Sequence, residues 1–307
     1  MTLVEDNIQN KFKNNAEHKR AKFKKPNSEL KMNKRVEIRS VWQQNLEYEF
    51  ALVEATIARY PFVSFDTEFP GTIHECNARD PPAHQYQIMK GNVDAMNIIQ
   101  LGLTLSDRYG NLPDLGTNCC YIWEFNFRDF DIERGDHHST NAIEFLKQQG
   151  IDFLQNKENG IYSSDFGWLM ERMVLHNRSR LTWVTFHGSY DFGYLMKILT
   201  RKDLPMDIGG FMGEVEKKFG ERVYDIKHLI KPCPGLYGGL ENVAQLLQVG
   251  RVAGKSHHAG SDSLLTLQTF MRLKDVHFGS FLNNKDHRSL SLNQFRGVLH
   301  SLELEAH

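Results

Sequence analysis

Two carboxylates lie two residues apart in a short apolar segment, FVSFDTEF at positions 62–69. Its β-branched and aromatic residues favour a strand, and a strand turns alternate side chains to one face, so Asp66 and Glu68 should project together. Val63 and Phe65 then point toward a core, as expected for a central strand whose end opens on a site. The segment therefore predicts one cleft that receives both acids.

Two neighbouring carboxylates repel each other, and a carboxylate buried without a partner carries a penalty on the order of several kcal/mol. A divalent cation is the simplest remedy. Mg²⁺ and Mn²⁺ take hard oxygen ligands, whereas Zn²⁺ favours His and Cys. The alternative for this segment alone is an exposed acidic strand end, and both interpretations stay open at this point.

A third acid follows a second apolar run. Residues 182–186 (TWVTF) read as a strand, and the chain then turns into SYDFGYLMKILT, whose apolar residues recur at helical spacing. Ser189 is the candidate cap and Asp191 lies in the first turn. An acid there is commonly a capping or helix-dipole residue. Alone, Asp191 would support only that role.

A fourth acid repeats this arrangement. Gly260 and Ser261 lead into Asp262, which opens another apolar helix, and His257 lies five positions before it on the preceding loop. Histidine titrates near neutral pH, so one beside metal-bound water can act as a general base. The alternative is a surface or core histidine, which is the commoner role for any one of the fourteen His taken singly.

The order Asp-x-Glu, then Asp, then His-x₄-Asp resembles the DEDD-type 3′ exonuclease superfamily. Longer words narrow the resemblance to the CAF/Pop-type poly(A)-specific ribonucleases, the deadenylase subunit of the CCR–NOT complex. These words are FDTEFPGT, NIIQLGLTLSD, WEFNFRDFD, GIDF, WVTFHGSYDFGYLMKILT, VYDIKHL, GGLENVA and HHAGSDSLLT. The similarity runs from about Val41 to the C-terminal stretch ending GVLHSL.

The resemblance implies an α/β fold of the RNase H-like DEDD exonuclease type, with a mixed central sheet flanked by helices. It implies two divalent metal ions, Mg or Mn, held by Asp66, Glu68, Asp191 and Asp262, with His257 as the base. The implied activity is 3′–5′ shortening of mRNA poly(A) tails with release of 5′-AMP. The implied partners are poly(A) RNA and a large helical-repeat scaffold subunit of the CCR–NOT complex.

Two positions depart from the usual family pattern. The word before the third acid usually reads His-Ser-Gly-Tyr-Asp, and here Gly188 and Ser189 stand in the opposite order, which alters the loop but keeps Asp191. Before the fourth acid the family usually has Gln where this chain has His258. The chain therefore offers two adjacent imidazoles: His257 fits the family spacing, and His258 fits the shorter spacing that other branches fill with Tyr.

Composition indicates one catalytic domain preceded by a basic arm. A chain of 307 residues that is 40% hydrophobic can bury one large core, and no repeat or long linker divides it. The net charge of −1 hides an asymmetry, since residues 1–36 carry +6 and residues 37–307 carry −7. We expect residues 1–36 to be a disordered arm that contacts RNA, serves nuclear import or aids solubility. Residues 37–307 would form the deadenylase domain.

Cysteine usage and hydropathy bound the location. The four cysteines show neither a Cys-x-x-Cys pair nor the spacing of a disulfide framework, which favours a reducing compartment. No signal peptide or long apolar run is present in the sequence. We expect a soluble intracellular protein, cytoplasmic with the nucleus as a second location, and no membrane partner.

The remaining segments alternate between predicted helices and strands around a mixed sheet. A loop with Gly and Pro, DRYGNLPDLG, joins two strands into a hairpin, and Gly150 closes one helix. The predicted helices are 41–60, 139–149, 165–175, 204–219 and 241–249, and the further strands are 97–104, 120–127 and 222–226. We place the site at the edge of the sheet, where the first two acids on a strand face the other two on helices.

Two other patterns carry less weight. VGRVAGKS ends like a phosphate-binding loop, but it lacks the first glycine and follows a predicted helix. Asp225 stands at a strand and could approach the site, although a structural role fits better. The alternatives to a deadenylase are a DEDD exonuclease of other specificity and a weakly active scaffold subunit. Since all four acids and the histidine are present, catalysis is favoured.

Overall fold

The computed structural model describes residues 34–77, 79–278 and 291–303. The chain divides into two units, Met1–Arg35 and Val36–His307. Nearly all of the predicted arm, residues 1–36, lies outside the described residues, so its disorder and its role stay predictions. The larger unit carries the fold and the candidate site.

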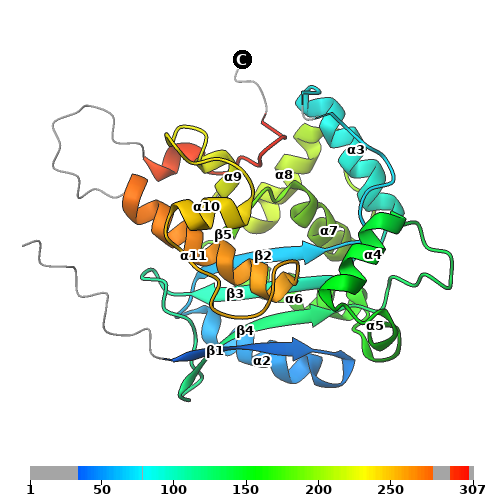
Figure 1. Cartoon of the computed structure of the whole chain (residues 1–307), viewed down its shortest axis with the longest axis horizontal. Helices are drawn as coiled ribbons and strands as arrows, with labels where there is room; N and C mark the ends of the chain where they lie inside the picture. Colours follow the sequence, from blue (N-terminus) through cyan, green and yellow to red (C-terminus); the bar gives the residue numbers. More distant parts are fainter. Residues whose placement is uncertain (1–33, 78, 279–290, 304–307) are drawn as a thin grey trace, which may run out of the picture. The chain divides into compact units, whose positions relative to one another are not determined.

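Six strands form one mixed sheet in the order β1-β4-β3-β2-β5-β6 (Figure 1). β2 pairs antiparallel with β3 and β3 with β4, whereas β2 with β5 and β5 with β6 are parallel. The strands are β1 (Arg35–Val41), β2 (Phe62–Glu68), β3 (Gln100–Ser106), β4 (Cys119–Asn126), β5 (Thr182–Thr185) and β6 (Val223–Asp225). An antiparallel meander followed by parallel strands is the RNase H-like arrangement, so the predicted fold class is confirmed.

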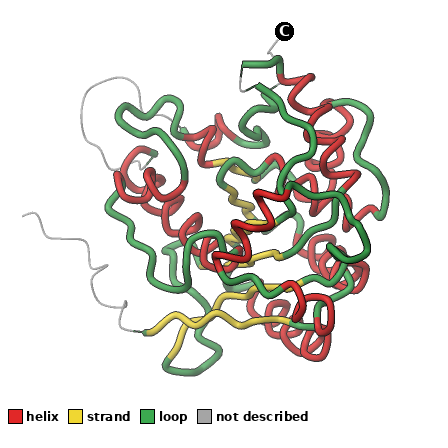
Figure 2. The backbone as a smooth tube through the Cα atoms, turned by 45° about the vertical axis from the view of Figure 1, so that its right-hand side comes forward, coloured by secondary structure: helices red, strands yellow, loops and turns green. Residues whose placement is uncertain are grey.

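Helices cover both faces of this sheet. Helix α11 (Ala259–His277) crosses β2 and β3 on one face (Figure 1). On the other face Phe125 of β4 packs against Phe50 of α2 (Leu46–Ile57) and Phe166 of α6 (Ser163–Asn177). On the same face Phe65 of β2 packs against Phe192 of α7 (Ser189–Thr200). Figure 2 shows the strands lying between helices on either side. These aromatic contacts confirm that Phe65 points into the core, as the alternation of the first segment predicts.

The helices that make up these layers are as follows: α2 (Leu46–Ile57), α3 (Pro82–Ala95), α4 (Thr140–Gln149), α5 (Phe153–Asn159), α6 (Ser163–Asn177), α7 (Ser189–Thr200), α8 (Ile208–Phe219), α9 (Ile226–Leu229), α10 (Leu240–Leu246) and α11 (Ala259–His277). Short 3₁₀ turns cover Gln43–Asn45 and Leu292–Phe295. None of the helices in the described ranges is long and apolar enough to cross a membrane.

Most predicted elements are confirmed, with shifts at their ends. The predicted hairpin corresponds to β3 and β4, and Gly150 ends α4 in the left-handed conformation at φ 105°. The predicted helix 41–60 is wrong at its start, because Val41 belongs to β1 and the helix begins at Leu46. Strand β1 and helices α3, α5 and α9 have no predicted counterpart. They change the flanks of the fold without moving the strands that carry the acids.

The first turn of α11 lies directly on the sheet. A Cβ atom at Gly102 of β3 would stand 1.8 Å from the Ala259 carbonyl oxygen, so only glycine permits this approach. Ser64 of β2 donates its hydroxyl to the Ser263 carbonyl oxygen at 2.7 Å. Because alternate residues of a strand share a face, Asp66 lies on the same face of β2 as Ser64. The seating of α11 therefore brings Asp262 to the acids of β2.

Candidate active site

The predicted site residues meet at the carboxyl end of β2, a central strand of the sheet with β3 and β5 on its two sides. Asp66 and Glu68 come from this strand, Asp191 from the first turn of α7, and Asp262 from the first turn of α11. One ligand atom each from Glu68, His257 and Asp262 all lie within 4.8 Å of one another. Three elements far apart in the sequence thus supply one acidic cluster.

Asp191 is held by the strand beside it. Its Oδ1 accepts hydrogen bonds from the Thr67 backbone N–H at 2.8 Å and from the Thr67 hydroxyl at 2.6 Å. The predicted cap is wrong: Gly188 is the N-cap of α7 and Ser189 is its first helical residue. A Cβ atom at Gly188 would lie 2.1 Å from the Thr185 hydroxyl oxygen, so the end of β5 leaves room for glycine alone at this turn.

Asp225 fixes the turn that precedes α7. Its buried carboxylate accepts four backbone N–H groups, from His187 at 2.8 Å, Lys227 at 2.9 Å, Gly188 at 3.1 Å and His300 at 2.9 Å. These donors come from the β5–α7 turn, the start of α9 and the C-terminal segment. The bonding satisfies the carboxylate without a metal, which is the pattern of a structural residue.

Asp262 is held by a main-chain donor and an arginine. Its Oδ2 accepts the backbone N–H of His257 at 2.8 Å, and its Oδ1 lies 2.5 Å from Nη2 of Arg251. Arg251 also pairs with Glu241 of α10. Sequence reasoning missed Arg251, which lies in the segment weighed only as a phosphate-binding loop. No local spacing rule joins an arginine to an acid eleven residues later.

The two adjacent histidines take different directions. His257 is exposed, adopts a left-handed φ of 60°, and places its ring 4.7 Å from the ring of Phe145 on α4, centroid to centroid. His258 is half-buried, serves as the N-cap of α11, and holds Nε2 2.8 Å from the Gln149 carbonyl oxygen. Of the two imidazoles, the one of His257 lies with the carboxylates.

Burial raises the pKa of all four carboxyls, and the charges of neighbouring acids in the cluster raise those of Asp66 and Glu68 further. Burial, followed by the charges of Asp262 and Asp191, raises the pKa of Glu68 to about 8. Burial is also the main cause that raises the pKa of Asp191 to about 7 and that of Asp66 well above its usual range. The pKa of Asp262 rises by burial against the opposing charge of Arg251. The cluster therefore disfavours its own negative charge, which a bound cation would relieve.

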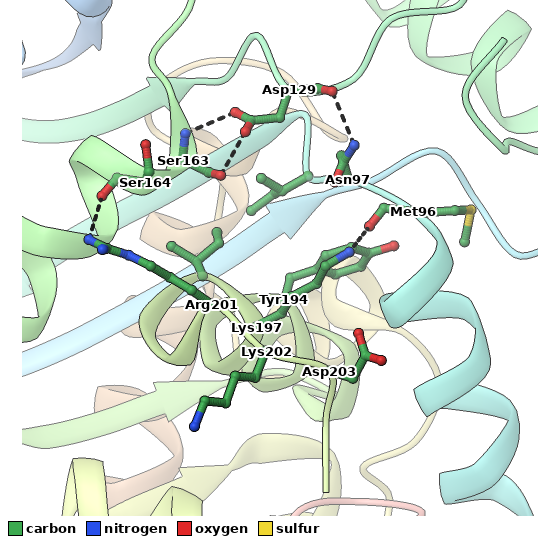
Figure 3. A pocket seen from close by; sticks show the side chains of 12 residues that line it. Met96, Asn97, Asp129, Ser163, Ser164, Tyr194, Lys197, Arg201, Lys202 and Asp203 are labelled. Atoms are coloured by element: carbon green, nitrogen blue, oxygen red, sulfur yellow. Dashed lines mark hydrogen bonds between the residues drawn. The ribbon is translucent and has the colours of Figure 1, made fainter.

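A separate pocket of about 270 Å³ lies along the carboxyl-terminal half of α7 (Figure 3). It is lined by Lys197 of that helix, by Arg201 at its C-cap and by Asp129, whose carboxylate accepts from the Ser163 backbone N–H at 2.9 Å. Lys197 is already occupied, since its ammonium donates to the Met96 carbonyl oxygen at 2.8 Å. None of the five predicted site residues lines this pocket, so it is distinct from the acidic cluster.

Sequence comparison matches residues 41–165 to the CAF1 family ribonuclease. The protein named Probable CCR4-associated factor 1 homolog 7 of Arabidopsis thaliana is 45% identical over 275 residues, which cover 88% of this chain and 94% of that protein. The poly(A) ribonuclease pop2 of Schizosaccharomyces pombe is 37% identical over 263 residues, which cover 85% of this chain and 75% of that protein.

Solved structures agree. The S. pombe Pop2p structure, described as a Mg²⁺- and Mn²⁺-bound form, superposes with a TM-score of 0.76 at 36% identity and covers 86% of this chain and 99% of its own. A chain from the structure of the yeast NOT1 MIF4G domain co-crystallized with CAF1 matches at a TM-score of 0.68 and 31% identity, covering 86% and 96%. With relatives this similar over most of its length, the chain belongs to the CAF1 ribonuclease family.

Proposed function

We propose that this protein is a metal-dependent 3′–5′ exoribonuclease that shortens mRNA poly(A) tails and releases 5′-AMP as the deadenylase subunit of a CCR–NOT-type complex. The observation that carries the proposal is the convergence of Asp66, Glu68, Asp191 and Asp262 at the end of one strand in a CAF1 family chain. The relative named poly(A) ribonuclease pop2 supports poly(A) as the substrate. The yeast NOT1 MIF4G domain co-crystallized with CAF1 supports a NOT1-type scaffold as the partner. A cytoplasmic protein with access to the nucleus is part of the same proposal.

The residues fit two divalent ions of the Mg or Mn type. Carboxylate oxygens are the ligands that these ions prefer, and burial with like-charge repulsion raises the pKa of Glu68 to about 8. The Mg²⁺- and Mn²⁺-bound form of the pop2 relative supports the same choice of metal. When bound, two such ions make water more acidic and stabilise the leaving 3′-oxygen of a phosphodiester.

Other residues of the protein orient the carboxylates, and one accepts the proton of the attacking water. Thr67 fixes the carboxylate of Asp191 through two hydrogen bonds, and Arg251 fixes that of Asp262. His257 lies beside Asp262 and is exposed, so its imidazole nitrogen can take the proton of the attacking water. The acids would hold the metal ions, and the imidazole of His257 would accept the proton of the attacking water.

The test is digestion of a 5′-labelled RNA that carries an A tail beyond a mixed sequence. With Mg²⁺ or Mn²⁺ the A tail should shorten one nucleotide at a time and the enzyme should slow at the first non-A stretch. A chelator should abolish the activity, and an equivalent DNA should be a poor substrate because it lacks the 2′-OH. Asp66→Asn should be inactive, whereas Glu158→Gln, a change at an exposed acid of α5, should keep the wild-type rate.

Each alternative has its own outcome in this experiment. Equal degradation of A, U and C tails would leave a DEDD exonuclease of other specificity. Internal cuts in a circular RNA would overturn the exonuclease assignment. Full activity in metal-free buffer would contradict the metal-dependent mechanism. A trace of activity that does not change in Asp66→Asn would leave the scaffold role.

A further inference from the structure

The main chain of His257 is held more firmly than its imidazole ring. Its backbone N–H donates to Asp262 at 2.8 Å and its φ is 60°, so the main chain is constrained. Within the part of the chain that the structure describes, we find no hydrogen bond to its ring nitrogens. The side chain is exposed, and its close ring contact is with Phe145 at 4.7 Å between centroids and 78° between planes. An exposed histidine without such a contact would sample several rotamers.

Phe145 belongs to a stripe of α4 that spans the site. Ala142, Phe145 and Gln149 lie three and four residues apart, so they share one face of the helix. At one end, a Cβ atom on Gly71, in the loop after β2, would lie 2.6 Å from the Ala142 Cβ atom. At the other end the Gln149 carbonyl oxygen bonds the ring of His258. α4 is thereby fixed to both segments that flank the acids, with Phe145 between them.

Phe145 is not needed to bury α4. Ile143 and Leu146 of the same helix are 4% and 3% exposed and pack in a small cluster with Ile99, Phe130 and Ile151. Phe145 is 38% exposed and stands outside that cluster. A large aromatic ring that is 38% exposed and contacts the proposed general base contributes more to the site than to the core.

We propose that Phe145 is a positioning residue that holds the imidazole of His257 over the carboxylates of Glu68 and Asp262. The inference rests on the proposed role of His257 as general base. An edge-to-face ring contact biases the orientation of the imidazole, and its loss should lower kcat by roughly 3- to 10-fold. Because Phe145 acts through His257 and does not hold the RNA, KM should stay unchanged.

A double-mutant cycle tests this directly. Phe145→Ala, Phe145→Leu, His257→Ala and the double variant Phe145→Ala/His257→Ala are assayed on A-tailed RNA at saturating Mn²⁺, with thermal unfolding as the check on folding. Phe145→Ala should lower kcat alone, and Phe145→Leu should restore part of it. The same Phe145→Ala change should have no effect once His257 is already Ala. Leu154→Ala on α5, which removes a 63% exposed apolar side chain, should leave kcat and KM as they are.

Three results would overturn the inference. Wild-type kcat in a folded Phe145→Ala protein would show that the contact does not matter. A raised KM that persists in the His257→Ala background would show that Phe145 contacts the RNA instead. A near wild-type rate for His257→Ala would remove the base itself and this inference with it. The poly(A) activity is judged separately, by the chelator and tail-specificity experiment.

Discussion

Raising the pH from 7 to 8.5 should destabilise the metal-free protein. Glu68 has a pKa of about 8 in the folded state, raised by burial and by its acidic neighbours, and Asp191 a pKa of about 7. Both lie above the usual values of these carboxyls, so the folded state binds more protons than the unfolded state across this window. Stability is present where those protons are bound and is lost as the pH rises through the folded pKa values.

The magnitude follows from the pKa values of Glu68 and Asp191. Between pH 7 and 8.5 the bound proton of Glu68 accounts for about 1 kcal/mol of stability and that of Asp191 for a smaller amount. Solvent screening at the half-buried Glu68 reduces this, so we expect a total loss on the order of 1 kcal/mol. For a domain of this size the loss corresponds to a fall of roughly 2–5 °C in Tm. The window avoids His187 and His300, whose lowered pKa values matter only below about pH 6.5.

Thermal unfolding of chelator-treated protein at pH 7.0, 7.5, 8.0 and 8.5 and constant ionic strength measures the effect. Glu68→Gln should flatten most of the slope, and Glu158→Gln, a change of an exposed acid, should leave it intact. Saturating Mn²⁺ should remove the loss, because metal binds the ionised carboxylates and stabilises the folded state. A Tm that is constant or rises with pH in the metal-free protein would refute the raised pKa values of these buried acids.

Three further predictions concern the histidines, the structural acid and the arm. His257→Ala should lower kcat on A-tailed RNA by about 10²–10⁴-fold and His258→Ala much less, since the ring of His258 is bonded to the Gln149 carbonyl oxygen; the reverse ranking would assign the base to His258. Asp225→Asn places an amide NH₂ opposite backbone N–H donors, so it should lower the free energy of unfolding in urea by about 2–4 kcal/mol. Unchanged stability would show that the four N–H bonds to Asp225 do not stabilise the fold. Deleting residues 1–36 should make the salt dependence of RNA binding shallower without changing kcat at saturating RNA, and equal slopes would indicate a solubilising tail.

Local rules sufficed for much of the fold. Alternation along a strand placed Asp66 and Glu68 on one face, and helical spacing placed Asp191 and Asp262 in first turns, as the structure shows. These rules did not predict β1. Its sequence, RVEIRSV, largely alternates polar and apolar residues, but it adjoins the basic arm, whose charged residues dominate the local composition. Residue preference predicts Ser189 as the cap of α7. The N-cap is Gly188 instead, because Thr185 leaves no room for a side chain at that position.

The fold class, the family resemblance and the grouping of the four acids could be predicted from the sequence, because each depends on neighbours within a few residues or on motifs that are continuous in the chain. The three-dimensional arrangement was needed to show which imidazole faces the acids, that Arg251 pairs with Asp262, and that Phe145 contacts His257. Those contacts arise where α4 and the loop after α10 meet the start of α11, which lies on β2 and β3. The separation in sequence of such partners, more than one hundred residues for Phe145 and His257, leaves no local pattern from which their contact could be predicted.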